Sequence, residues 1–221
     1  MNKLHVDSVT KSYSRKKILN GVFLSCEKGE IKGLIGRNGC GKSTLLKIVF
    51  GVEKSDFKFV KVGNKRVKNI ADGRNLINYL PQENFLPSNV KVKTLITLFL
   101  TKENRKYLFE NEFVKELLDK KSQELSGGEK RIFEILLIIH SNADFILLDE
   151  PFNGLSPILR SYIIKYIKEL KISKGFIIND HDYENVIEVA DKILFLKDGS
   201  LKEIKERKEL VQLGYLSKAM L

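Results

Sequence analysis

Residues 36–43 read Gly-Arg-Asn-Gly-Cys-Gly-Lys-Ser and match the pattern G-x-x-x-x-G-K-[ST] without a gap. The five residues before them, Ile31-Lys32-Gly33-Leu34-Ile35, are typical of a buried strand, and the stretch from Ser43 to Val49 is typical of an amphipathic helix. A strand, a glycine-rich loop and a helix in this order are the setting that the pattern requires. The stretch therefore predicts a phosphate-binding loop in an α/β fold.

The residue types of this loop suit phosphate binding. Its glycines let the backbone curl until its N–H groups face phosphate oxygens, and the following helix adds the positive end of its dipole. Lys42 can reach the β- and γ-phosphates, and the Ser43 hydroxyl can bind Mg²⁺. The alternative is a glycine-rich turn with a chance lysine, which leaves the periodicity on both sides unexplained. The expected contacts of a nucleoside triphosphate are Gly36, Asn38, Gly39, Cys40, Gly41, Lys42, Ser43 and Thr44.

The composition is typical of a soluble globular protein. The 221 residues are enough for one sizeable domain, and 43% of them are hydrophobic and 30% charged. The longest apolar runs, such as Ile135–Ile139, fall well short of the roughly 18 residues that span a bilayer. Since residues 1–7 hold no apolar signal region, we expect a cytoplasmic protein.

The net charge of +11 raises the question of an anionic partner. Lysines are scattered through the chain, with clusters only at Arg15-Lys16-Lys17 and between Lys115 and Lys121, and no aromatic residues are interleaved with them. We therefore expect a solvated basic surface and no nucleic-acid partner.

The two cysteines, Cys26 and Cys40, lie far apart and lack the spacing of metal ligands. We interpret both as reduced structural thiols. The alternative for Cys40 is a thiol whose pKa is lowered by the helix N-terminus, which would make it sensitive to oxidation.

Strand and turn signals lie on both sides of the loop. Alternating residues predict strands at 4–9 and 21–26, and residues 57–80 predict two or three more strands with turns at Gly63-Asn64 and Asp72-Gly73. Glycine is absent between residues 84 and 124, and apolar residues at helical spacing predict a small helical insert at about 84–135.

After the insert, strands alternate with helices. Apolar runs predict strands at 145–148, 175–179 and 192–196, and helices are expected to begin near Ser126, Ser156 and Asp182, with a further one after Glu206. Nearly continuous apolar strands indicate a parallel sheet covered on both faces. The predicted fold class is therefore α/β, with a mixed, mainly parallel sheet, N-terminal antiparallel strands and a small helical subdomain, all in a single domain over residues 1–221.

A second glycine motif follows the insert. Leu125-Ser126-Gly127-Gly128-Glu129 precedes a long apolar helix, so its backbone N–H groups form another anion site, with Ser126 as the N-cap. Taken alone, the pentapeptide has the alternative of a plain helix cap with a flexible entry.

Two strands end in polar residues that suit catalysis. The strand at 145–148 leads into Asp149 and Glu150, and ligands bind at the carboxyl edge of an open α/β sheet. Asp149 can hold Mg²⁺, directly or through a water, and Glu150 can orient and activate the attacking water. The alternative is a buried strand that ends in acids by chance. The strand at 175–179 leads to His181, which is placed to contact a γ-phosphate.

The set of motifs resembles the nucleotide-binding subunit of an ATP-binding-cassette (ABC) transporter. The resemblance covers essentially the whole chain, and a phosphate loop, LSGGE and LLDEP in this order are very specific to that family. It implies an ATPase that uses ATP and Mg²⁺, with catalytic roles for Lys42, Gln82, Glu150 and His181, Mg²⁺ ligation by Ser43, Gln82 and Asp149, and stacking of adenine on Tyr13. An ordinary surface tyrosine is the alternative for Tyr13.

The resemblance also implies partners. In this family the phosphate loop of one subunit faces the LSGG motif of another, so Ser126, Gly127, Gly128 and Glu129 are expected to bind ATP held by a second copy or a sister ABC subunit in a head-to-tail dimer. The helical insert is expected to pass the closing motion to a separate membrane-spanning permease. The chain is accordingly expected at the cytoplasmic face of the cell membrane.

The chain departs from the family pattern at several positions. Ser156 stands where an aspartate usually couples the two sites of the dimer, although a serine can still cap the next helix. Glu129 replaces the usual glutamine, and the stretch from Gln82 to Leu125 is shorter than usual.

Two other functions compete with transport. One is a soluble ABC ATPase that drives no transport, as in iron–sulfur assembly, which a single cassette of this size allows. The other is a degenerate cassette that binds ATP as a structural clamp, for which Ser156 is the indication. The intact Lys42, Asp149, Glu150 and His181 argue against the clamp.

Overall fold

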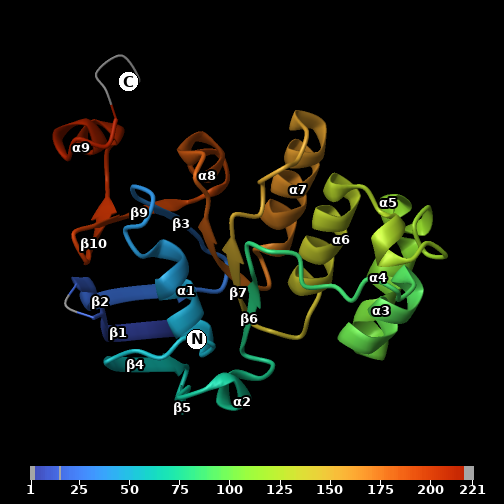
Figure 1. The fold of residues 1–221 in the computed structure, drawn as a ribbon, viewed down its shortest axis with the longest axis horizontal. Coiled ribbons are helices and arrows are strands. Elements are labelled where there is room, and N and C mark those ends of the chain that lie inside the picture. Colours follow the sequence, from blue (N-terminus) through green and yellow to red (C-terminus); the bar gives the residue numbers. More distant parts are fainter. Residues whose placement is uncertain (1–2, 15, 217–221) are drawn as a thin grey trace.

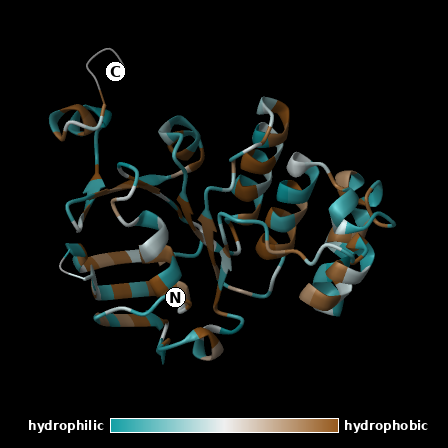
Figure 2. Cartoon of the chain, in the orientation of Figure 1, coloured by the Kyte–Doolittle hydropathy of each residue, from teal (hydrophilic) through white to brown (hydrophobic). Residues whose placement is uncertain are grey.

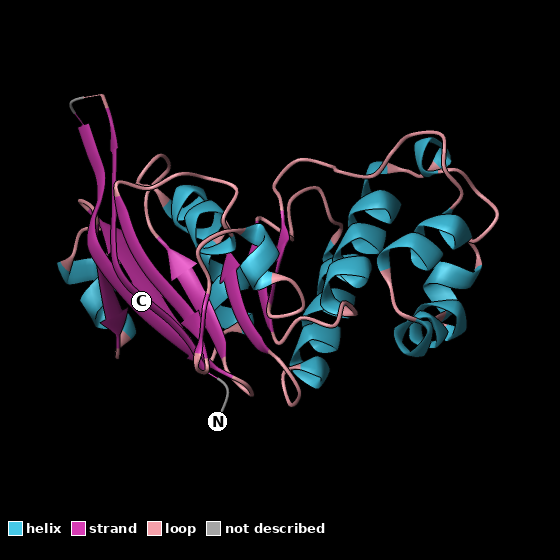
Figure 3. Cartoon of the chain, turned by 90° about the horizontal axis from the view of Figure 1, so that it is seen from below, coloured by secondary structure: helices cyan, strands magenta, loops and turns pink. Residues whose placement is uncertain are grey.

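The computed structural model describes residues 3–14 and 16–216 of the chain. Figures 1 and 3 show two sheets gathered at one end of the molecule and a group of helices at the other. The strands are β1 (Lys3–Tyr13), β2 (Lys16–Glu27), β3 (Ile31–Ile35), β4 (Phe57–Val62), β5 (Lys65–Arg66), β6 (Ile77–Leu80), β7 (Phe145–Asp149), β8 (Gly175–Asn179), β9 (Lys192–Lys197) and β10 (Ser200–Ile204). The helices are α1 (Lys42–Phe50), α2 (Ile70–Gly73), α3 (Val92–Phe99), α4 (Lys102–Glu110), α5 (Glu112–Lys115), α6 (Gly127–Ile139), α7 (Pro157–Leu170), α8 (Tyr183–Val189) and α9 (Arg207–Gln212), with a 3₁₀ turn η1 (Ser122–Glu124).

The N-terminal strands form an antiparallel sheet in the order β2-β1-β4-β5. Apolar residues such as Leu4 and Val6 point into the core, and the residues between them are only partly buried. Ser8 and Gly21 have positive φ values of 55° and 63°, and the β1–β2 register shifts beside Ser8. The strands continue past this bulge to lengths of 11 and 12 residues, beyond the predicted strands at 4–9 and 21–26.

The second sheet has the order β10-β9-β3-β8-β7-β6, and its strands from β9 to β6 run parallel. Successive residues of β7 enter different cores. Phe145 and Leu147 pack with α1 and the antiparallel sheet, whereas Ile146 and Leu148 pack with α6 and α7. Figure 2 shows that the central strands are largely hydrophobic, as a sheet covered on both faces requires. The predicted α/β fold with a mixed, mainly parallel sheet is confirmed.

Two local features differ from the sequence-based expectation. β10 was not expected because its residues are mostly polar and exposed; Asp198 and Gly199, with φ values of 48° and 75°, form the turn that folds it antiparallel onto β9. Asp72-Gly73, predicted as a turn, lies in the short helix α2, where the Asn69 side chain accepts a hydrogen bond from the Asp72 N–H.

The helices cover the parallel sheet from both sides. α1 lies between the two sheets, and α6 and α7 pack on the opposite face. α3, α4 and α5 pack in the same core as α6 and lie within the stretch predicted as a helical insert. Within residues 3–14 and 16–216, no helix combines the length and the hydropathy that crossing a membrane requires.

Candidate active site

The phosphate loop connects the end of β3 to the start of α1. Its three glycines, Gly36, Gly39 and Gly41, have φ values of 156°, 74° and 110°, a range that L side chains rarely adopt. A Cβ at position 41 would also lie 2.7 Å from Cγ2 of Ile18. Both the backbone conformation and the packing therefore require glycine at this position, directly before α1.

Lys42 is the first residue of α1, and its side chain curls back over the loop. It is only 7% exposed, and its Nζ donates to the carbonyl oxygens of Gly36 at 2.8 Å and of Arg37 at 3.3 Å. The ammonium therefore has two backbone carbonyl oxygens as hydrogen-bond acceptors. The Lys42 ammonium lies at the N-terminus of α1, and both its charge and the helix dipole favour binding of a phosphate.

A cavity of ≈ 660 Å³ opens in front of this loop. It brings together residues from five separate segments of the chain. Those predicted from the sequence are Tyr13, Asn38, Gly39, Gly41, Lys42, Ser43, Thr44, Gln82, Glu150 and His181, and Ile18 and Asn153 complete the lining. The other predicted residues, Gly36, Cys40, Asp149 and Ser126 to Glu129, do not line this cavity. The volume suits a ligand of drug-like or nucleotide size.

Asp149, at the end of β7, is the centre of a buried polar cluster. Its side chain is fully buried, and Oδ1 accepts hydrogen bonds from Ser43 Oγ at 2.9 Å and Asn179 Nδ2 at 2.6 Å. Oδ2 accepts from the hydroxyl of Tyr79 at 2.8 Å. The cluster therefore ties the phosphate loop to three strands of the parallel sheet.

The same cluster fits Mg²⁺. The Ser43 hydroxyl and the Asp149 carboxylate, whose oxygens lie 2.9 Å apart, are both oxygen ligands of the kind that Mg²⁺ prefers. The neighbouring Asn179 Oδ1 is buried and has no hydrogen-bond partner among the described residues, which suits a bound water. Ser43 and Asp149 are thus the side chains that would hold the ion, with Gln82 also facing the cavity.

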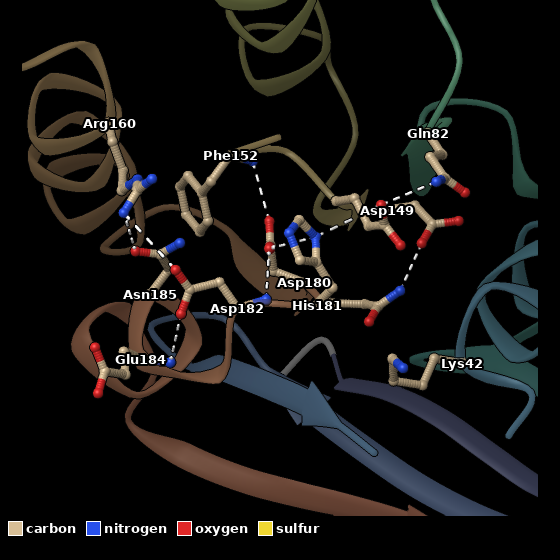
Figure 4. A network of polar contacts seen from close by, with 12 residues as sticks. Lys42, Gln82, Asp149, Phe152, Arg160, Asp180, His181, Asp182, Glu184 and Asn185 are labelled. Carbon is tan, nitrogen blue, oxygen red and sulfur yellow. Dashed lines mark hydrogen bonds and ion pairs between the residues drawn. The ribbon is translucent and has the colours of Figure 1, made fainter. Parts of the chain in front are cut away.

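Glu150 follows Asp149 in a strained backbone conformation, with φ at 50°. Its Oε2 accepts a hydrogen bond from Gln82 Nε2 at 2.9 Å and lies 3.8 Å from His181 Nδ1. Figure 4 shows Gln82, His181 and Lys42 on different sides of the neighbouring Asp149. Burial, helped by the neighbouring Asp149 charge, raises the pKa of Glu150 above its usual range. A carboxylate with a raised pKa beside a polar cavity suits a general base.

His181 is held on a short loop between β8 and α8. The buried carboxylate of Asp180 accepts N–H groups from Phe152 at 3.2 Å and Asp182 at 3.0 Å, which ties this loop to the segment after β7. The His181 ring itself stays half-exposed at the edge of the cavity. It can therefore reach a ligand without losing its support.

A buried arginine in the site was missed by the sequence analysis. Arg131 on α6 is 5% exposed, and its guanidinium donates to the carbonyl oxygens of Pro81, Asp149 and Glu150, each at 2.9 Å. Glu134, one turn along, lies 3.5 Å from Arg131 and accepts the N–H of Phe85 at 3.0 Å. The pair joins the helix after LSGGE to the backbone of both carboxylates and to the segment that carries Gln82. The only signal in the sequence was a charged pair within the apolar part of α6 that follows Lys130.

We expect Arg131→Met to lower the free energy of unfolding by about 3–5 kcal/mol, because it leaves the Glu134 carboxylate buried without its partner. Adding Glu134→Leu should recover most of this stability but not the turnover, since the carbonyls of Asp149 and Glu150 still lack their donor. Urea denaturation and phosphate release measure the two effects, with the exposed Arg66→Met as control. A double variant with the turnover of the parent would show that Arg131 does not position the site.

The LSGGE motif lies at the start of α6, and Figure 1 places this helix on the far side of β6 and β7 from α1. The Ser126 hydroxyl accepts the N–H of Glu129 at 3.2 Å, and the Glu129 carboxylate accepts the N–H of Ser126 at 2.7 Å. This N–H holds the pKa of Glu129 below its usual range. The motif is therefore a helix cap that does not line the cavity in front of the phosphate loop of its own chain.

Two further sequence interpretations can be compared with the structure. Ser156 caps α7 by accepting the N–H of Leu159 at 3.4 Å, as expected for a serine at this position.

Burial raises the pKa of the Cys40 thiol, which contradicts the alternative of a reactive thiolate, and burial also raises the pKa of Cys26 to about 12. Both cysteines are free thiols, in agreement with a structural role.

Comparison with known proteins identifies the family. The family model described as ABC transporter matches residues 19–153. The lipopolysaccharide export system ATP-binding protein LptB of Escherichia coli (strain K12) is 30% identical over 215 residues, which cover 91% of this chain and 89% of LptB. The spermidine/putrescine import ATP-binding protein PotA of Mesoplasma florum is 30% identical over 214 residues; the match covers 92% of this chain but only 61% of PotA.

Solved structures agree with this match. A nucleotide-free ATP-binding cassette from an ABC transporter superposes with a TM-score of 0.81 at 27% identity, over 100% of this chain and 98% of that one. The ATP-binding subunit of another ABC transporter superposes with a TM-score of 0.83 over 97% and 94% of the two chains, and at 22% identity it shows the fold alone. The chain belongs to the ABC transporter family. It is an ATP-binding subunit of this family and an ATPase.

Proposed function

We propose that this chain hydrolyses ATP as half of a head-to-tail dimer, with a second copy or a sister ABC subunit. The observation that carries the proposal is the separation of the two anion sites. The phosphate loop lines the cavity with Glu150 and His181, whereas the capped Ser126 to Glu129 motif lies elsewhere on the molecule. Each ATP would be enclosed by the loop of one chain and the LSGGE motif of the other.

The roles within one half-site follow from its contacts. Lys42 exchanges its carbonyl partners for the β- and γ-phosphates, and Tyr13 stacks on the base at the other end of the cavity. Glu150, oriented by Gln82, accepts a proton from the attacking water, and His181 contacts the γ-phosphate. Mg²⁺, held by Ser43 and Asp149 with Gln82 nearby, would neutralise charge on the phosphates. These residues act by positioning and by charge compensation around the phosphoryl group.

The partner in this proposal is a separate membrane-spanning permease, with the chain at the cytoplasmic face of the membrane. A second cavity of ≈ 620 Å³ lies between the nucleotide-binding core and the helical insert. Phe50, Ile70, Ile77 and Phe99 contribute its apolar lining. Phe99 is exposed and lies 5.8 Å from Phe85, three residues after Gln82. A permease segment bound there would contact both the nucleotide-binding core and the helical insert. Through the contact between the Phe99 and Phe85 rings, it would also be linked to the segment that carries Gln82.

Isolation of the tagged protein from detergent-solubilised membranes of its host tests this assignment. We expect a multi-helix membrane protein to copurify in stoichiometric amounts, and we expect Phe99→Asp to abolish its recovery because a buried charge in the interface lacks a partner. Ile172→Asp, at an exposed position away from the cavity, serves as control. Recovery of soluble partners alone would favour the competing function, a soluble ABC ATPase as in iron–sulfur assembly.

A further inference from the structure

We propose that Lys11 and Glu53 are positioning residues that hold Tyr13 ready to stack on a nucleobase, and so determine how much the base contributes to nucleotide affinity. This inference depends on the proposed function, in which Tyr13 contacts the base.

The Lys11 ammonium is fixed in three directions. Although it is a lysine on a strand near the surface, it is only 9% exposed. Its Nζ donates to Glu53 Oε1 at 2.7 Å and to the Lys54 carbonyl oxygen at 2.6 Å, and it lies 4.5 Å from the centre of the Tyr13 ring. Two of the three N–H donors of the ammonium therefore have oxygen acceptors, and the cation lies over the ring. The cation is therefore held in place against the ring by a cation–π contact.

The ammonium behind the ring is fixed by Glu53. The hydrogen bond from Lys11 is the main reason why the pKa of Glu53 is lowered. The same contact raises the pKa of Lys11, so both groups are charged at neutral pH. Glu53 lies in the segment after α1, the helix that begins with Lys42. Its N–H donates to the Lys47 carbonyl oxygen at 3.3 Å, so Glu53 ties Lys11, and the ring that Lys11 contacts, to α1.

The open face of the ring is the one that meets the ligand. Tyr13 is 47% exposed and lines the cavity together with Gly39, Gly41 and Lys42, whereas Lys11 does not line it. Residues two apart on a strand share one side of it, which lets Lys11 contact the Tyr13 ring although Lys11 does not line the cavity. An ordinary surface tyrosine would need no partly buried ion pair beside it. A ring that is already ordered loses less freedom when a base stacks on it.

The test compares affinities for ATP and for inorganic tripolyphosphate, which has no base, by calorimetry on the purified chain. We expect Lys11→Met to raise the Kd for ATP about three- to tenfold and to leave the Kd for tripolyphosphate unchanged. Tyr13→Ala should raise the Kd for ATP about tenfold, again without affecting tripolyphosphate. The double variant should be no weaker than Tyr13→Ala, because Lys11 acts only through the ring. Glu53→Gln provides a second route to the same effect if Lys11→Met folds poorly.

Lys61→Met, in the neighbouring strand β4, is the matched control for loss of a lysine. Equal weakening of ATP and tripolyphosphate by Lys11→Met and Glu53→Gln would overturn the inference, because it would indicate damage to the phosphate loop. An unchanged ATP affinity in both variants, with a loss in Tyr13→Ala, would overturn it while leaving the base contact intact. If Tyr13→Ala left the ATP affinity unchanged, both the base contact and this inference would fall.

Discussion

Replacing Glu150 with glutamine is expected to lower kcat for ATP hydrolysis by about 10²- to 10⁴-fold, the usual contribution of a general base. The amide keeps the shape of the carboxylate and can still contact Gln82, whose Nε2 now donates to Glu150 Oε2 at 2.9 Å. What it cannot do is take a proton from water. Binding of MgATP should therefore survive, and the protein should accumulate in its ATP-bound form.

Two measurements check this result. Phosphate release gives kcat, and size-exclusion chromatography with MgATP should show a dimer that the parent, which hydrolyses its ATP, forms only transiently. Glu116→Gln, an exposed position on the helical side, controls for the loss of one negative charge. Turnover equal to the parent would refute the catalytic role of Glu150. A variant that stays monomeric with ATP would contradict a shared site formed by this chain alone.

The pH dependence of kcat in the parent protein should reflect the titration of Glu150. Because burial and Asp149 raise the pKa of Glu150, the carboxylate is ionised only above this raised pKa. Lowering the pH protonates it, so kcat should fall at a higher pH than an ordinary carboxylate would give. The fall should be absent from the residual turnover of Glu150→Gln.

The fold could be predicted largely from local patterns. The strands at 31–35 and 175–179 have the predicted bounds because both are buried on both faces, and a continuous apolar run between polar ends leaves little freedom in their placement. The edge strand β10 was missed because it is polar and exposed, and it depends on its hairpin turn and on pairing with β9. Long-range pairing also explains why β1 and β2 extend beyond their alternating segments.

The candidate site divides in a similar way. The phosphate loop around Lys42 could be predicted, because its glycines and charged residues are contiguous in the sequence. Arg131 and Tyr79 were not visible, since each acts on atoms 18 or more positions away along the chain, Arg131 on the Asp149 carbonyl and Tyr79 on the Asp149 carboxylate. Such contacts exist only after the sheet has formed. Lys11 was missed for the same reason, as its ion pair with Glu53 spans 42 positions.

Replacing Lys42 with alanine is expected to reduce both nucleotide affinity and turnover by about 10²- to 10³-fold. Among the residues that line the cavity, Lys42 is the one lysine or arginine, and its Nζ donates to the Gly36 carbonyl oxygen at 2.8 Å. A triphosphate enclosed there without it would keep an uncompensated charge, which costs about 3–5 kcal/mol for a buried pair. Lys47→Ala, an exposed position on the same helix, isolates this effect from the loss of a lysine as such.

The loss of affinity caused by Lys42→Ala should depend on the phosphates of the ligand and not on its base. Calorimetry should therefore show the same fold-decrease in affinity for ATP and for tripolyphosphate, in contrast to the base-dependent loss expected from Tyr13→Ala. The two variants report on opposite ends of one cavity, and their effects should add because the residues share no partner. A Lys42→Ala protein with near-normal ATP turnover would refute the assignment of the phosphate loop, whatever the behaviour of the remaining residues.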